Sequence, residues 1–202
     1  METISRIDDV EGQRDIVEII MSTTTPQTET LTWTLDSAHS SVDFSVKHLG
    51  LFTVRGALGT VTGTAETVNG SLASVALSID ATGISTNNEQ RDGHLNSADF
   101  LNVGEYPSIE FKSTSIEKKS DTEYTVTGGL TIVGKTNPLT VDVEVVAPVK
   151  DPWGNTRSGA TGSGKLNRKD WGLTYNSVLE TGHLMISDEV KFTFDIQGVT
   201  AS

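Results

Sequence analysis

The feature that most constrains this chain is a period-two alternation of apolar and polar residues that returns in seven separate segments. In the last of them, Val190, Phe192 and Phe194 alternate with charged or hydroxyl side chains. Successive side chains of a β-strand point to opposite faces, so each segment should present one face to an apolar interior and the other to water. The other six segments lie at residues 31–35, 42–48, 75–80, 109–112, 124–132 and 139–145.

Glycine is frequent, with 19 residues, while hydrophobic residues make up only 35% of the chain. This composition favours many strands joined by tight turns over a helical bundle. We expect the glycine-rich stretches 56–67 and 158–168 to add strands with the bulges or bends that barrel corners require. One helix is expected over Glu89–Leu101, with Asn87 or Asn88 as its cap.

Many one-sided antiparallel strands must hide their apolar faces and their edges. A sandwich hides the faces, whereas a closed barrel hides both. With about eight strands, a barrel interior is either filled by side chains or holds one small ligand, and alternation alone does not separate these cases. We predict a single all-β antiparallel domain at residues 31–200, preceded by an N-terminal tail at residues 1–30 that is disordered or forms a short helix.

Charge and composition exclude several functions. The formal net charge of −12 disfavours nucleic acid as a partner and docking on an anionic membrane through a basic patch. The chain has no cysteine, which excludes disulfides and thiolate chemistry. It has no apolar run near the roughly 18 residues that span a bilayer, so no stable membrane insertion is expected. The acidic N-terminus does not read as a secretory signal, and we therefore expect a cytoplasmic location.

Several longer strings carry a family resemblance. In order and spacing, the chain resembles the YceI family of polyisoprenoid-binding, lipocalin-like proteins over about residues 32–198. The resemblance implies an extended eight-stranded barrel with one short helical segment, an apolar bore for an isoprenoid or fatty-acyl chain, no cofactor, and a possible homodimer. The strings are WTLDSAHSSVDFSVKHLG (33–50), LFTVRGALG (51–59), RDGHLNSADFLNVGEYPSIEFKS (91–113), GGLTIVGKTNPLTVDVEV (128–145), KDWGLTYN (169–176) and EVKFTFDIQGV (189–199).

Residues of the apolar parity are the candidates for lining the bore. His48 shares this parity near a strand end, where it is either a head-group ligand or an internally bonded histidine. Arg91 and His94, on the expected helix, are head-group candidates, and the alternative for Arg91 is a salt bridge that pins the helix. Large aromatic side chains such as Trp33 and Phe52 are assigned to the core by default. The hypothesised bore residues are Val42, Phe44, Val46, His48, Leu77, Phe111, Phe192 and Phe194.

Three functions remain open from the sequence. The predicted one is non-enzymatic binding, storage or transport of a long-chain apolar lipid, either a polyisoprenoid or a related isoprenoid quinone or fatty-acyl molecule. The second is a lipid-modifying enzyme that uses a cavity histidine, although no G-x-S-x-G elbow is present. The third is a structural barrel packed solid. The four histidines show no close ligand spacing, so no metal site is predicted.

Overall fold

The computed structural model describes residues 28–178 and 184–200. The predicted tail therefore lies almost wholly outside the described residues. These two ranges contain one α-helix, α1 (Glu89–Asn96), and two 3-10 turns, η1 (Ser37–His39) and η2 (Arg168–Trp171). The strands are β1 (Thr30–Leu35), β2 (Ser41–His48), β3 (Phe52–Ala57), β4 (Val61–Val68), β5 (Ser71–Asp80), β6 (Ser108–Lys118), β7 (Glu123–Ile132), β8 (Lys135–Lys150), β9 (Thr156–Asn167) and β10 (Ile186–Thr200).

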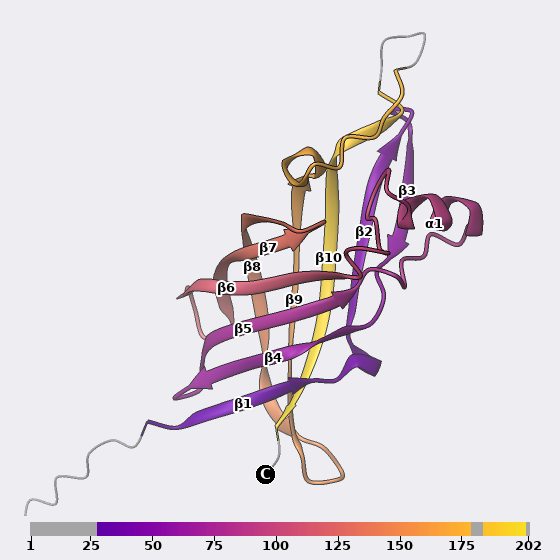
Figure 1. Cartoon of the computed structure of the whole chain (residues 1–202). Coiled ribbons are helices and arrows are strands. Elements are labelled where there is room, and N and C mark those ends of the chain that lie inside the picture. The colour runs from indigo at the N-terminus through magenta and orange to yellow at the C-terminus, as the bar shows by residue number, and fades with distance from the viewer. Residues whose placement is uncertain (1–27, 179–183, 201–202) are drawn as a thin grey trace, which may run out of the picture.

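The strands form one antiparallel sheet that closes on itself. The sheet order is β1-β4-β5-β6-β7-β8-β9-β10-β2-β3, and β1 also pairs with β10 through Thr34↔Val199 and Leu35↔Gly198. Eight strands, β1 and β4 to β10, thus complete a cylinder, which confirms the predicted eight-stranded barrel. β1 and β2 follow one another along the same edge of β10, with η1 between them. In Figure 1, β1 and β4–β7 cross β8–β10 and β2 at a steep angle.

The expected strands are all present, and both glycine-rich stretches contribute to them as β3, β4 and β9. The helix is shorter than predicted. Asn88 caps it by accepting a hydrogen bond from the Arg91 backbone N–H, as expected. It ends at Asn96 rather than Leu101, because Ser97 adopts an extended backbone (φ −74°, ψ 173°) and its hydroxyl donates to the His94 carbonyl.

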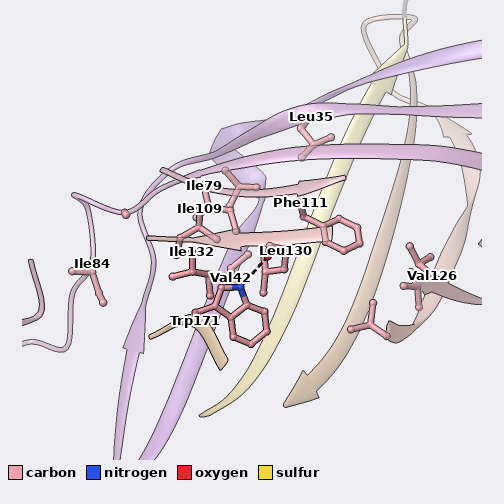
Figure 2. Close-up of a cluster of buried hydrophobic side chains, with 14 of the residues drawn as sticks. Leu35, Val42, Ile79, Ile84, Ile109, Phe111, Val126, Leu130, Ile132 and Trp171 are labelled. Carbon is pink, nitrogen blue, oxygen red and sulfur yellow. Dashed lines mark hydrogen bonds between the residues drawn. The ribbon is translucent and has the colours of Figure 1, made fainter. Parts of the chain in front are cut away.

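Part of the apolar core surrounds the indole of Trp171 in η2. This side chain is 4% exposed, and its Nε1–H donates to the Leu130 carbonyl at 2.9 Å. Figure 2 shows the indole beside Val42, Leu130 and Ile132, which come from β2 and β7. A buried Trp N–H usually finds such a partner, since an unpaired donor is costly inside a protein. Trp171 therefore ties η2 to the barrel wall.

Arg157 in β9 joins three parts of the barrel at the other end. Its Nη1 lies 2.7 Å from Asp36 Oδ2, and its Nε lies 2.7 Å from Asp151 Oδ2. Burial raises the pKa of Asp151, but hydrogen bonds from Arg157, Asn155 and the Trp153 backbone outweigh it and hold that pKa at about 2. The hydrogen bond from Arg157 likewise lowers the pKa of Asp36. Both carboxylates thus stay charged and fix the β8–β9 turn to the corner between β1 and β2.

Candidate functional site

The interior of the barrel is not filled. It encloses a cavity of about 700 Å³, lined mostly by the apolar residues that the strands turn inward. At a liquid-like share of roughly 30 Å³ per small group, this volume holds on the order of two dozen carbon-sized groups. It falls within the usual range of ligand pockets, about 300 to 1,000 Å³. The cavity is large enough for one chain-like guest.

All ten candidate bore and head-group residues line this cavity, and their binding role stays a prediction. The eight that lie on strands point inward through strand parity, whereas Arg91 and His94 lie on α1. The default core assignment is wrong for Phe52, which is 63% exposed at the start of β3, and right for Trp33, which is 4% exposed. The ten candidate residues on the cavity are Val42, Phe44, Val46, His48, Leu77, Phe111, Phe192, Phe194, Arg91 and His94.

Four of these residues are phenylalanines whose rings occupy space left by a glycine on the neighbouring strand. A Cβ added at any of the four glycines would lie between 2.3 and 2.6 Å from ring carbons, closer than real Cβ atoms approach. Glycine in a strand often marks such a close approach, and an aromatic ring can cover it. The rings therefore lie against the barrel wall, which keeps the centre open. The pairs are Phe44 with Gly56, Phe111 with Gly128, Phe192 with Gly164, and Phe194 with Gly162.

Polar lining residues gather at the end of the cavity near α1 and η2. The His94 ring makes edge contacts with Phe100 and Tyr175, at centroid distances of 5.0 and 4.8 Å. Its Nε2 lies 2.9 Å from Asp99 Oδ2, which fixes the ring orientation. His48, at the end of β2, also lines the cavity. This end offers hydrogen-bonding groups beside an otherwise apolar lining.

Arg91 holds the loop before α1 and also lines the cavity. Its Nε donates to Thr86 Oγ1 at 2.6 Å and its Nη2 to the Thr86 carbonyl at 2.9 Å. The Thr86 hydroxyl in turn donates to Asp92, and this hydrogen bond lowers the pKa of that carboxyl. The anchoring partner of Arg91 is thus a threonine and not the acidic residue of a salt bridge. Its Nη1 has no hydrogen-bond partner among the described residues, so it remains able to donate.

Arg168 is a cavity-lining residue that the sequence did not single out as a ligand candidate. It is 3% exposed, and its Nη1 donates to the carbonyls of Leu173 and Tyr175 at 2.6 and 2.9 Å. Its Nε donates to the Ser187 carbonyl, and its Nη2 lies 3.5 Å from Asp188 Oδ1. Burial lowers the pKa of Arg168, and the charge of Asp188 opposes that shift. Arg168 therefore positions the segment that brings Tyr175 to the cavity.

In the part of the chain that the structure describes, no cluster of three or more His, Cys, Asp or Glu residues is arranged to hold a metal ion. Within residues 28–178 and 184–200, no helix has both the length and the apolar character to cross a bilayer.

The closed antiparallel barrel and its large apolar cavity define a lipocalin-like class of protein. Residues 33–198 match the family described as the YceI-like domain, and the chain belongs to this family. It is 35% identical to Protein YceI of Escherichia coli O157:H7 over 166 residues, which cover 81% of this chain and 83% of that protein. It is also 35% identical to a UPF0312 protein of Vibrio cholerae over 138 residues, 67% of this chain and 73% of the relative.

Solved structures share the fold. Burkholderia cenocepacia BcnA aligns with a TM-score of 0.68 and 22% identity, over 81% of this chain and 98% of that chain. A polyisoprenoid binding domain from Saccharophagus degradans, implicated in plant cell wall breakdown, aligns with a TM-score of 0.64 and 15% identity. The alignment covers 85% of this chain and 99% of that domain. At these identities the likeness concerns the fold.

Proposed function

We propose that this protein binds a long-chain apolar lipid in its barrel and stores, shields or carries it without a covalent step. Suitable guests are a polyisoprenoid, an isoprenoid quinone or a fatty-acyl molecule. The observation that carries this proposal is the cavity of about 700 Å³. Its lining is mostly apolar, and its polar groups lie chiefly at one end. The guest's chain lies along the apolar part, and its polar end lies near His48, Arg91 and His94.

The driving force is burial of the guest's hydrocarbon. Each CH₂ group that leaves water contributes about 0.8 kcal/mol, so about 20 groups contribute roughly 16 kcal/mol. Loss of overall motion and ordering of the guest oppose this by an estimated 4 to 15 kcal/mol or more. Net affinity therefore depends on how completely the guest fills the cavity. Short guests should bind weakly, and affinity should rise with chain length until the cavity is full.

The polar end of the cavity adds orientation. Arg91 Nη1 is available as a donor, and His94 is held in place by Asp99 and two aromatic rings. Such convergent polar groups in an apolar pocket usually fix which end of a ligand points where. The polyisoprenoid binding domain of Saccharophagus degradans shares this fold, which supports the choice of ligand class.

Titration of delipidated protein with a fluorescent fatty acid, and competition by geranylgeraniol, tests the proposal. Phe192→Asn places an amide in the cavity and should weaken binding at least tenfold, while Thr193→Asn, on the exposed face of the same strand, should leave it unchanged. Leu77→Asn, in β5, gives a second probe should the Phe192 variant fail to fold, and circular dichroism reports folding. Equal affinity in all folded variants contradicts binding in the barrel.

Location in the cytoplasm and pairing of two subunits stay predictions. Cell fractionation and analytical ultracentrifugation of the full chain check them.

A further inference from the structure

Exposed apolar side chains gather where β2 turns into β3 and where β10 begins. The exposed fractions are 75% for Leu51 and 63% for Phe52, and 72% for Val178 and 38% for Leu184. Large side chains of this kind are usually buried, and exposed ones that gather in one place often mark an interaction surface. We call these four residues the apolar tip.

The two halves of the apolar tip are held together by backbone pairing. The Leu49 N–H donates to the Met185 carbonyl at 2.8 Å. His48 pairs with Phe52 on one side and with Ile186 on the other. The tip is therefore one surface and not two separate loops.

The turn inside the apolar tip carries backbone strain. Leu49 and Gly50 have φ values of +56° and +70°. The β4–β5 turn has nearly the same pair of φ values, +50° at Asn69 and +76° at Gly70, but asparagine tolerates the left-handed region. A leucine in this region is uncommon and costs conformational energy. Val133 also has a positive φ, but it packs against the core. Leu49 itself is half-buried, next to the exposed Leu51, and strain that is kept at such an apolar turn residue points to a function for the turn.

The β2–β3 half of the apolar tip carries positive charge, whereas the acidic residues Asp188 and Glu189 at the start of β10 are paired with Arg168, Lys169 and Lys165. Residues 45–58 contain Lys47 and Arg55 and no Asp or Glu, although the whole chain has a net charge of −12. Both side chains are exposed, and neither forms an ion pair with any described residue. They lie on β2 and β3, one on each strand of the hairpin. An apolar tip with a cation on each flanking strand matches the apolar interior and anionic headgroups of a lipid surface.

The apolar tip is continuous with the cavity. His48, Val54, Met185 and Ile186 line the cavity and belong to the strands and segment that form the tip. Three other exposed apolar residues, Val146, Val149 and Trp153, lie in the last part of β8 and in the β8–β9 turn, at the opposite end of the barrel in Figure 1. A guest that leaves the cavity near His48 would therefore emerge beside the apolar tip.

We propose that the apolar tip, with Lys47 and Arg55, docks on the surface of a lipid bilayer. Leu51 and Phe52 enter the boundary between headgroups and acyl chains, and the two cations face anionic headgroups. This inference rests on the proposed function for its purpose, because docking there lets a lipid guest pass between bilayer and cavity with little exposure to water. It requires only shallow, reversible contact.

Flotation of the full chain with vesicles tests this docking. The vesicles are phosphatidylcholine alone, or phosphatidylcholine with phosphatidylglycerol. The double variant Leu51→Ser/Phe52→Ser should lose about tenfold or more in vesicle partitioning, since it removes two exposed apolar side chains. Trp153→Ser is the matched control, because it removes an aromatic residue that is 80% exposed at the other end, and it should partition like the wild type. Lys47→Gln/Arg55→Gln should lose the preference for anionic vesicles.

The outcomes distinguish a bilayer from a second copy of the chain as the partner of the apolar tip, and they distinguish a failure of the docking from a failure of the proposed lipid binding. Wild type that does not float, or equal loss in the tip and Trp153 variants, overturns the docking. Unchanged flotation of the tip variant together with weaker self-association in ultracentrifugation shows that the tip binds a second copy instead, which also overturns it. Each variant is also titrated with a fluorescent fatty acid without vesicles. If the protein binds the fatty acid normally but does not float with vesicles, only the docking is overturned. If it floats but does not bind the fatty acid, only the proposed function is overturned.

Discussion

Gly164→Ala examines whether a phenylalanine ring held against the wall keeps the cavity open. A Cβ at Gly164 would lie 2.4 Å from Phe192 Cζ, and its three nearest atoms all belong to that ring. Ordinary contacts begin near 3.4 Å, so the ring must move by about 1 Å. Because a side chain and not the backbone is in the way, the ring can move into the cavity. At the other three glycines that face a phenylalanine ring, an added Cβ would also clash with a backbone oxygen.

The empty space inside the barrel determines how much Gly164→Ala should change stability and ligand binding. In the unliganded barrel, the ring has room, and replacing glycine restricts the unfolded chain, which stabilises by about 0.4 to 1 kcal/mol. The free energy of unfolding should therefore stay within about 1 kcal/mol of wild type. A guest loses room beside the ring. If about two or three CH₂ groups lose their burial at about 0.8 kcal/mol each, binding weakens by roughly 2 kcal/mol, which is about 30-fold in Kd.

Urea unfolding of delipidated protein and titration with a fluorescent fatty acid measure the two effects separately. Gly129→Ala is the control, because its Cβ would meet only the Thr136 methyl group, at 3.0 Å, on the outward parity of β7. Gly129→Ala should change neither the free energy of unfolding nor the Kd for the fatty acid by much. In a barrel packed solid, Gly164→Ala would overfill the interior and destabilise by about 1 to 3 kcal/mol. That destabilisation with unchanged affinity would refute the reasoning.

Three further predictions follow from local geometry. Trp171→Phe removes the hydrogen bond that the indole donates to the Leu130 carbonyl and should destabilise the fold by about 1 to 3 kcal/mol, measured by urea unfolding; an unchanged midpoint would show that the indole does not anchor η2. The pKa of Asp151 is lowered to about 2, so the stability that its charged form contributes is present above about pH 4 and is lost as the pH falls towards 2. Arg157→Gln should make the fall of the urea midpoint with decreasing pH shallower. An equally steep fall in this variant would contradict the pairing. Leu49→Asn relieves left-handed strain and should stabilise by about 1 kcal/mol in thermal unfolding, whereas a loss of stability would show that the leucine side chain contributes to packing.

Strand parity explains why the cavity lining was predictable. Alternation places Val42, Phe44 and Val46 on one face whatever the register with neighbouring strands, so their inward direction follows from the sequence alone. The default assignment of large aromatic residues to the core was wrong for Phe52, because this residue lies at the start of β3, directly after the turn that begins at Leu49. Exposure at a strand end depends on what covers it, and periodicity carries no information about that.

The open interior depends on register, which a single sequence does not reveal. Phe192 faces Gly164 and Phe194 faces Gly162 across β10 and β9. The alternating F-x-F and G-x-G strings were visible as separate patterns, but only pairing shows that each ring lies over a missing side chain. A signal of this kind could be sought by aligning such strings between predicted neighbouring strands.

Residues from non-periodic segments were missed for another reason. Arg168 and Tyr175 reach the cavity through η2 and the chain that follows it, where no alternation exists. Their positions come from hydrogen bonds to Leu173 and Ser187, and from a ring contact with His94. The C-terminal end of α1 was predicted too late in the sequence. The hydrogen bond from the Ser97 hydroxyl to the backbone competes with continuation of the helix, and helix propensity does not capture this competition.

Native mass spectrometry of the freshly purified full chain tests the central claim most directly. Lipid binding in the barrel predicts a discrete, lipid-sized mass adduct that organic extraction removes and that an added long-chain isoprenoid or fatty acid restores. The bare chain from several expression hosts, together with no adduct after incubation with either lipid, would contradict it.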